Sequence, residues 1–237
     1  MLKLGEVKPG SMVVDMDDIL VYTTNLWFKY IMDNYEIFKP YLNEDVIPEN
    51  YDYSTHFNYP LTRPCYMFTD WLLKEGLSVE DQLVGRRFIM EAYHEQVNYF
   101  YRTVISTPLV DSLISMFKYK NFNFDKIYIV TRTFDNFEKE KIECIKRLFA
   151  PIIKDVEIRF TDIGEKKSDV IKDIENVSII FDDELSNIYD YLDNSGDNIN
   201  NCVMMMPITG YNTPFDKEYE NKAKDRNITL RYYNYND

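Results

Sequence analysis

Glycine, histidine and cysteine are scarce in this chain. Among its 237 residues there are 7 Gly, 2 His and 3 Cys. Neither GxGxxG nor GxxxxGK[ST] occurs, which removes the main support for a dinucleotide-binding or P-loop protein. His56 and His94 are too few for a histidine-rich metal site. Cys65, Cys144 and Cys202 are odd in number and lack a CxxC spacing, so we expect reduced thiols rather than a disulfide or a zinc site.

Basic residues are also in deficit. Against 40 Asp and Glu there are 27 Lys and Arg, which gives a formal net charge of -13. Polynucleotide binding depends on Lys and Arg that neutralise phosphates, so a nucleic-acid polymer is a disfavoured partner. A small phosphorylated substrate that meets a metal ion is not excluded. We recognise no signal peptide and no apolar run of membrane-spanning length, and therefore expect a cytoplasmic protein without a membrane partner. A homodimer is one possible oligomeric state.

What the sequence does contain is a cluster of acids directly after a short apolar run, in the stretch 11–20, SMVVDMDDIL. The run Met12–Val14 is typical of a buried parallel strand. Asp15, Asp17 and Asp18 then lie just past its carboxyl end, where open α/β sheets bind their ligands. Carboxylates this close repel one another, and a divalent cation is the usual compensation. Taken alone, the stretch fits an acidic helix-capping turn equally well.

The remaining chain divides into two parts with different patterns. Residues 22–105 show aromatic-rich helical periodicity and no β-alternation, which predicts an inserted helical segment. From residue 106 onward, short apolar strands alternate with helices. This alternation predicts an α/β fold with a mostly parallel, Rossmann-like sheet covered on both faces. We therefore expect a core formed by 1–21 and 106–237, and a helical insertion over 22–105.

Four polar features follow strand ends or begin a helix in this core: Asp15 and Asp17, Thr131, Lys167, and Asp182 with Asp183. Each is common by itself. Their order and settings resemble the haloacid dehalogenase-like (HAD) superfamily of phosphohydrolases, over residues 8–21 and 106–206. The resemblance implies Asp15 as the nucleophile and Asp17 as the general acid and base. Asp18 stands where many relatives carry a small residue, and we interpret it as a turn residue.

The same resemblance implies Mg²⁺ as the cofactor, because this ion prefers oxygen ligands. The expected ligands are Asp15, the backbone carbonyl of Asp17, and an acid of the pair Asp182 and Asp183. Asp182 is the preferred member, with Asp183 as the alternative, although an acidic helix start would also explain the pair.

Two further groups should neutralise the phosphoryl group. Thr131 is expected to supply a hydroxyl and neighbouring backbone N–H groups. The lysine of the family pattern is either Lys166 or Lys167, and we prefer Lys167 because it directly precedes the helical run that begins at Ser168. Arg132 either points toward the same place or lies at the surface.

Three functions are open at this stage. A helical insertion after the first strand occupies the place of a cap that excludes water and favours small substrates. The Asp-Met-Asp opening with such a cap is similar to 5'(3')-deoxyribonucleotidases, which implies a Mg²⁺-dependent phosphomonoesterase for a small phosphorylated metabolite, with a nucleoside monophosphate as one candidate. The alternatives are a HAD-fold binding or structural component with an unused site, and a polynucleotide 3'-phosphatase.

Overall fold

The computed structural model describes residues 7–43, 68–119, 123–133, 137–162, 164–208 and 214–233. These residues form two compact units, which we treat separately. The described residues up to 21, together with those of 106–208 and 214–233, form the sheet unit. The described residues between 22 and 105 form the helical unit. No helix in the described ranges is long and apolar enough to cross a membrane.

A six-stranded sheet in the order β3-β2-β1-β4-β5-β6 is the centre of the sheet unit. Every neighbouring pair of strands is parallel. All residues of β1, β4 and β5 are buried, as expected for strands covered on both faces. The predicted α/β class with a Rossmann-like sheet is therefore confirmed. The strands are β1 (Gly10–Val14), β2 (Phe124–Arg132), β3 (Val156–Thr161), β4 (Val177–Phe181), β5 (Val203–Pro207) and β6 (Thr229–Tyr233).

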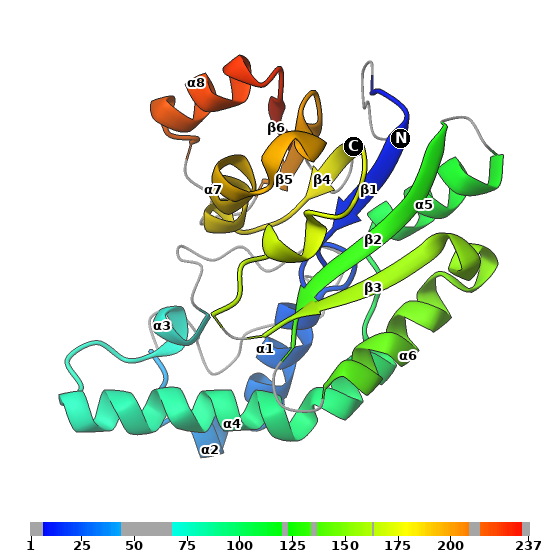
Figure 1. Cartoon of the computed structure of the whole chain (residues 1–237). Helices are drawn as coiled ribbons and strands as arrows, with labels where there is room; N and C mark the ends of the chain where they lie inside the picture. The colour runs from blue at the N-terminus through cyan, green and yellow to red at the C-terminus, as the bar shows by residue number, and fades with distance from the viewer. Residues whose placement is uncertain are drawn as a thin grey trace. The chain divides into compact units, whose positions relative to one another are not determined.

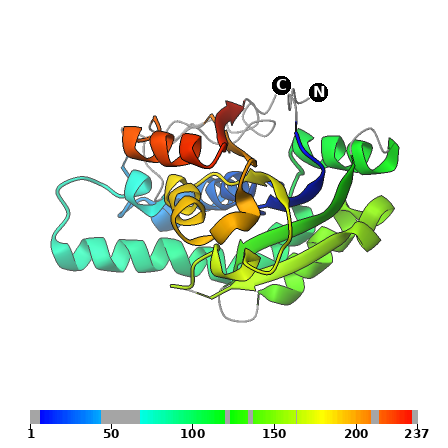
Figure 2. The ribbon, with the colours of Figure 1, turned by 45° about the horizontal axis from the view of Figure 1, so that its top comes forward.

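Four helices cover this sheet. Helices α5 (Pro108–Tyr119) and α6 (Glu138–Leu148) lie on one face, and α7 (Leu185–Asn194) and α8 (Lys217–Asp225) lie on the other (Figures 1 and 2). Three short 3-10 helices complete the described part of the unit: η2 (Ala150–Asp155), η3 (Asp169–Ile171) and η4 (Gly196–Ile199). The chain thus places β1 in the middle of the sheet, between strands that follow it far along the sequence.

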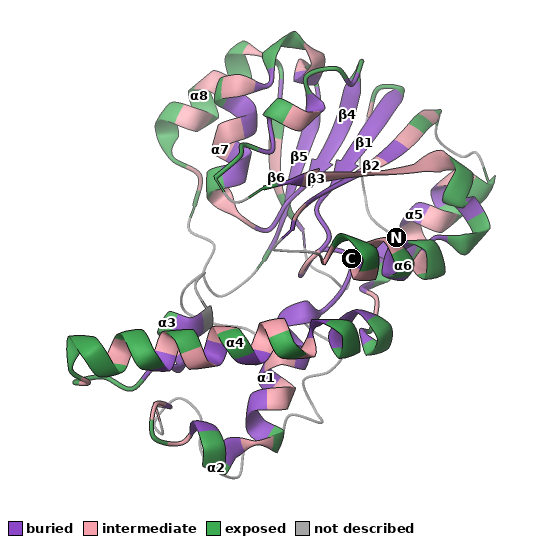
Figure 3. Cartoon of the chain, turned by 60° about the horizontal axis from the view of Figure 1, so that its bottom comes forward, coloured by how far each residue is buried: buried purple, intermediate pink, exposed green. Residues whose placement is uncertain are grey.

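The core of the sheet unit lies between the strands and their helices. Figure 3 shows buried residues along the central strands and exposed residues on the outer sides of the helices. One cluster joins strand side chains to α7 and α8, and includes Val13, Val130, Ile180, Ile188 and Met204. Burying such side chains contributes about 1.5–3 kcal/mol each before the entropy cost of ordering them. This packing holds the strand ends, and the residues that follow them, in a defined place.

The helical unit contains α1 (Thr23–Asp33), α2 (Tyr35–Phe38), α3 (Phe68–Leu72) and α4 (Val79–Thr103). The described residues of this unit form an isolated β-bridge but no β-strand. Ser78 caps α4, because the backbone N–H of Asp81 donates to the Ser78 Oγ at 3.1 Å. Aromatic side chains pack together in this unit, for example Trp27 with Tyr93 and Phe38 with Phe88. The role of this unit as a cap stays a prediction.

Candidate active site

The register of the sheet brings the first and last acidic motifs together. Val14 of β1 pairs with Phe181 of β4, so Asp15 and Asp182 follow at adjacent positions of neighbouring strands. The backbone N–H of Asp15 donates to the Phe181 carbonyl at 2.9 Å, which keeps the two chains paired past the end of β1. Because all strands are parallel, both carboxylates lie at the carboxyl edge of the sheet, the usual ligand side of such folds.

Lys167 joins these two carboxylates. Its Nζ lies 2.9 Å from Asp15 Oδ1 and 2.9 Å from Asp182 Oδ2. The lysine side chain is 3% exposed, and Asp182 is fully buried. A buried charge is tolerated only when it is paired and hydrogen-bonded, and here one ammonium serves two acids. The structure therefore brings three of the predicted site residues into one contact.

Burial and neighbouring charges shift both ionisable groups of this contact. Burial raises the pKa of Asp15 to about 6, and the charges of Asp182 and Asp17 act in the same direction while Lys167 opposes them. Burial alone would lower the pKa of Lys167, but the carboxylates of Asp15 and Asp182 outweigh it and hold this pKa well above the usual range. Lys167 is thus a permanent cation beside a carboxylate that ionises near neutrality.

Asp182 is held by more than Lys167. Its Oδ1 accepts hydrogen bonds from the backbone N–H of Glu184 at 3.0 Å and from the Asn187 Nδ2 at 2.9 Å. Asn187 belongs to the first turn of α7, so the helix position fixes the carboxylate. Both oxygens of Asp182 are therefore engaged by protein donors, and its orientation is set before any ligand binds.

Asp183 lies in the same cluster. Oxygens of Asp15, Asp182 and Asp183 lie within 4.8 Å of one another. Asp17 adds a fourth carboxylate, which contacts Lys141. The three clustered carboxylate oxygens are donors of the kind that a hard divalent cation such as Mg²⁺ prefers. The predicted acids of both motifs are thus suitably placed to hold such an ion.

A second lysine, which the sequence reasoning missed, completes the site. The Nζ of Lys141, on α6, donates to Asp17 Oδ2 at 2.6 Å, to Thr131 Oγ1 at 2.7 Å and to the Arg132 carbonyl at 2.7 Å. The sequence contains a pattern that indicates the burial of Lys141. Lys141 precedes the buried Cys144 and Ile145 by three and four positions, so it lies on the apolar face of an otherwise charged helix.

Asp18 takes the turn role that the sequence predicts. Its φ is +54°, in the left-handed region that Asp and Asn tolerate better than most residues. Its backbone N–H donates to the Val21 carbonyl at 2.8 Å and closes a tight loop after Asp17.

The structure also distinguishes the site residues from their sequence neighbours by burial. Lys166 is 56% exposed and lies 3.9 Å from Asp190, far less buried than Lys167. Arg132 is 41% exposed and approaches Glu184 at 3.9 Å. The helical run expected to begin at Ser168 is only the short η3, and the Ser168 side chain does not cap it. Instead, the Ser168 N–H and Oγ both donate to Asp190 at 3.0 Å, which anchors the segment that carries Lys167.

Comparison with known proteins finds structures of similar fold but no protein of similar sequence. No protein-family model matches the sequence, and no curated protein matches it significantly. Three solved structures cover 95% of this chain with a TM-score of 0.50. They are a HAD-like hydrolase from Streptococcus pneumoniae (13% identity, 94% of that chain), a candidate β-phosphoglucomutase from Thermotoga maritima (13%, 94%) and a candidate phosphatase from Clostridium difficile (12%, 95%). The chain therefore has the fold of the haloacid dehalogenase-like hydrolases.

Proposed function

We propose that this protein is a Mg²⁺-dependent phosphomonoesterase that acts on a small phosphorylated metabolite through an aspartyl-phosphate at Asp15. The observation that carries the proposal is the buried contact of Lys167 with Asp15 and Asp182 at the carboxyl edge of the sheet. Such a contact holds a carboxylate nucleophile next to a permanent positive charge. The fold shared with HAD-like hydrolases supports the same reading.

In the first step, an Asp15 carboxylate oxygen attacks the substrate phosphorus and forms a P–O bond, while the ester P–O bond breaks. Asp17 gives its proton to the departing alkoxide. In the second step, the Asp17 carboxylate takes a proton from water, and the water oxygen attacks the same phosphorus. The bond between Asp15 and phosphorus then breaks, which releases inorganic phosphate and restores both carboxyl groups.

The remaining groups stabilise charge on the phosphoryl oxygens. Thr131 directs a hydroxyl to them, and Lys167 neutralises charge shared between Asp15 and the phosphoryl group. Asp15, the Asp17 carbonyl and one acid of the pair Asp182 and Asp183 would hold Mg²⁺. Asp182 is the member that the sequence favours, but both of its oxygens already accept protein hydrogen bonds, so we propose Asp183 as the direct ligand. The ion, when bound, supplies further neutralisation of the phosphoryl oxygens.

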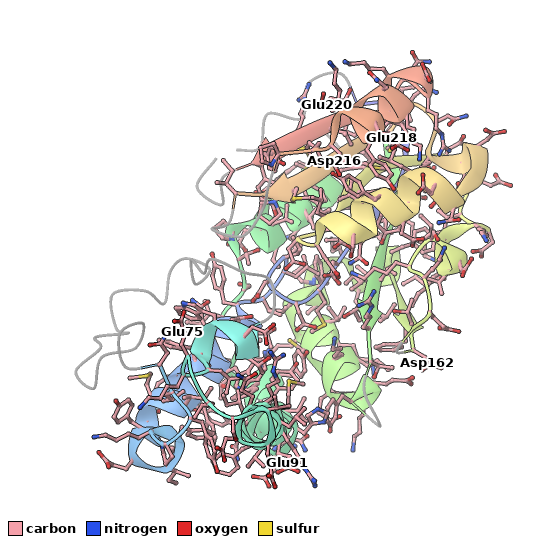
Figure 4. The ribbon with its side chains drawn as sticks, turned by 90° about the vertical axis from the view of Figure 1, so that its left-hand side faces the viewer. Glu75, Glu91, Asp162, Asp216, Glu218 and Glu220 are labelled. Carbon is pink, nitrogen blue, oxygen red and sulfur yellow. The ribbon has the colours of Figure 1, made fainter. Side chains whose placement is uncertain are left out.

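The substrate we propose is small. Acidic side chains lie exposed on both units, including Glu75, Glu91, Asp162 and the group at the start of α8, Asp216, Glu218 and Glu220 (Figure 4). An acidic surface repels a polynucleotide, which disfavours the 3'-phosphatase alternative. A nucleoside monophosphate remains the candidate that the nucleotidase resemblance suggests. The described aromatic rings of the helical unit pack on one another, so they lend no separate support to base stacking.

A phosphate-release screen tests this proposal. Purified protein is incubated with a panel of sugar phosphates, nucleoside monophosphates and p-nitrophenyl phosphate, with and without millimolar Mg²⁺. We expect release that needs Mg²⁺ and disappears in Asp15→Asn. The matched control is Asp18→Asn, an identical change three residues away in the turn, which should keep most of the activity. Full activity of Asp15→Asn, or no release from any substrate, would overturn the proposal in favour of a binding or structural protein.

A further inference from the structure

We propose that Lys141 is a positioning residue for phosphoryl transfer, which holds the Thr131 hydroxyl and the Asp17 carboxylate in their working orientations without itself contacting the substrate. This inference rests on the function proposed above and deepens it. The starting observation is that one side chain of α6 reaches two candidate catalytic groups on different parts of the chain, Thr131 near the end of β2 and Asp17 in the turn after β1.

The ammonium of Lys141 has an acceptor for each of its donors. A lysine ammonium has three N–H donors and no acceptor. At least three oxygens lie within hydrogen-bond distance of Lys141 Nζ: Asp17 Oδ2 at 2.6 Å, Thr131 Oγ1 at 2.7 Å and the Arg132 carbonyl at 2.7 Å. The side chain is 5% exposed. All three protons are therefore used within the protein, which leaves no donor of this lysine for a phosphoryl oxygen.

The contact decides the direction of the Thr131 hydroxyl proton. A threonine hydroxyl carries one donor proton and two acceptor lone pairs. Because Lys141 donates to Thr131 Oγ1, the hydroxyl acts as the acceptor on that side. Its own proton must point elsewhere, and the hydrogen bond from an ammonium polarises the O–H bond. Lys141 thus makes Thr131 a better donor to a phosphoryl oxygen.

The same contact fixes the side chain of Asp17. This side chain is 32% exposed, so packing alone restricts its rotation less than for the buried Asp15. The hydrogen bond from Lys141 holds Oδ2 of Asp17 next to the Thr131 hydroxyl. A proton donor that is misplaced by about 1 Å can lose about 10²-fold in rate. Lys141 therefore acts on the chemical step through Asp17 as well as through Thr131.

The Lys141 ammonium is held rigidly because its third contact is to the backbone. Arg132 is the last residue of β2, and its carbonyl receives the third N–H of Lys141. Lys141 itself lies next to the buried Cys144 and Ile145 of α6. The ammonium is thus tied to a strand end and carried by a packed helix. An arginine cannot replace it, because a planar guanidinium does not direct three N–H groups from one nitrogen.

The first experiment compares Lys141→Met with Lys141→Arg in steady-state hydrolysis of p-nitrophenyl phosphate at saturating Mg²⁺. We expect kcat to fall about 10²-fold in both variants while KM changes less than about threefold, because the substrate is not contacted. The matched control is Lys146→Met, the same change at an exposed position of the same helix. A variant at Lys141 with wild-type kcat, or one that changes KM alone, would overturn the inference.

A double-mutant cycle separates positioning from mere support of the fold. If Lys141 acts through the Thr131 hydroxyl, Lys141→Met should reduce kcat much less in a Thr131→Val background than in the wild-type background. In a Thr131→Ser background, which keeps the hydroxyl, the full reduction should return. Equal, multiplicative losses in all three backgrounds would contradict an action through Thr131. Denaturant unfolding of each variant identifies any that does not fold, and Lys141→Arg then serves in place of Lys141→Met.

A readout besides turnover tests the contact itself. In ¹⁵N-labelled protein, an ammonium held by three acceptors exchanges its protons slowly and gives an observable side-chain resonance. We expect such a resonance in the wild type, its loss in Lys141→Met and a shift in Thr131→Val. Absence of the resonance in the wild type would contradict the three-acceptor arrangement. If the wild type shows no Asp15-dependent hydrolysis, the proposed function fails, and a surviving resonance then assigns a structural role to Lys141.

Discussion

The Nζ of Lys167 lies 2.9 Å from Asp15 Oδ1, inside the protein and next to a second acid. The two residues are 152 positions apart in sequence and meet because Asp15 directly follows β1 while Lys167 lies in the connection that returns the chain to β4. A nucleophile and its neutralising charge are thus placed by the sheet rather than by a local motif.

Lys167→Met should remove most of the activity. The substitution takes away the only cation that contacts Asp15 among the contacts described, and leaves two buried carboxylates uncompensated. Removing one preorganised charge typically costs about 10²–10³ in kcat, and breaking a buried ion pair costs about 3–5 kcal/mol of unfolding free energy. The control is Lys166→Met, at an exposed neighbouring position, where we expect less than about 0.5 kcal/mol and near-normal kcat. Equal effects at both positions would refute the assignment of Lys167.

The pH profile of kcat/KM should fall on its acid side because Asp15 becomes protonated. The pKa of this carboxyl is raised to about 6, chiefly by burial, so below that pH the proton blocks its attack on phosphorus. With Mg²⁺ far below saturation, kcat/KM should fall about tenfold per pH unit below this value. Because the cation and the proton compete for one carboxylate, saturating Mg²⁺ should move this fall to lower pH. A fall that stays at the same pH at all Mg²⁺ concentrations would argue against Asp15 as a ligand.

The two acids after β4 should differ in their effects. Asp182 has both oxygens engaged by Lys167, Glu184 and Asn187, so Asp182→Asn should place an amide N–H₂ against a donor and lower the unfolding free energy by about 2 kcal/mol or more. Asp183→Asn should lower Mg²⁺ affinity by at least about tenfold with a smaller loss of stability. Isothermal titration with Mg²⁺ and denaturant unfolding measure the two effects. The reverse pattern would assign Asp182 as the principal ligand.

Gly10→Ala should destabilise the strand that carries Asp15. Gly10 has φ +152°, and an added Cβ would lie 2.0 Å from the Asn176 carbonyl oxygen and 2.4 Å from Ser178 Oγ. The backbone of Asn176, directly before β4, cannot move aside without shifting the strand that leads to Asp182, so we expect a loss of about 3 kcal/mol. Gly196→Ala is the control: its φ is also positive, at +74°, but no atom lies within 4 Å of its Cβ position. That variant should lose only about 1 kcal/mol, and similar losses at both positions would contradict the steric reason.

The fold class could be predicted because it depends on local patterns. Apolar strands that alternate with helical periodicity indicate a parallel sheet wherever they occur, and each acidic motif is recognisable as the residues that follow a strand. The turn at Asp18 could be predicted for the same reason, since it depends on the conformation of a few neighbouring residues. The helical run expected after Lys167 is only the short η3, where Asp190 of the distant α7 accepts from both donors of Ser168.

The sequence by itself determined the alternation of strands and helices, and with it the edge of the sheet where the acids of 15–18 and 182–183 lie. Only the tertiary structure decided which side chains meet there. Lys166 and Lys167 are alike as neighbours in sequence, but only Lys167 is buried between two carboxylates. Lys141 reaches Asp17 because its helix, α6, carries it to the end of β2, where it also contacts Thr131 and Arg132. Hydrogen bonds between residues this distant depend on strand register and helix packing, which no local pattern contains.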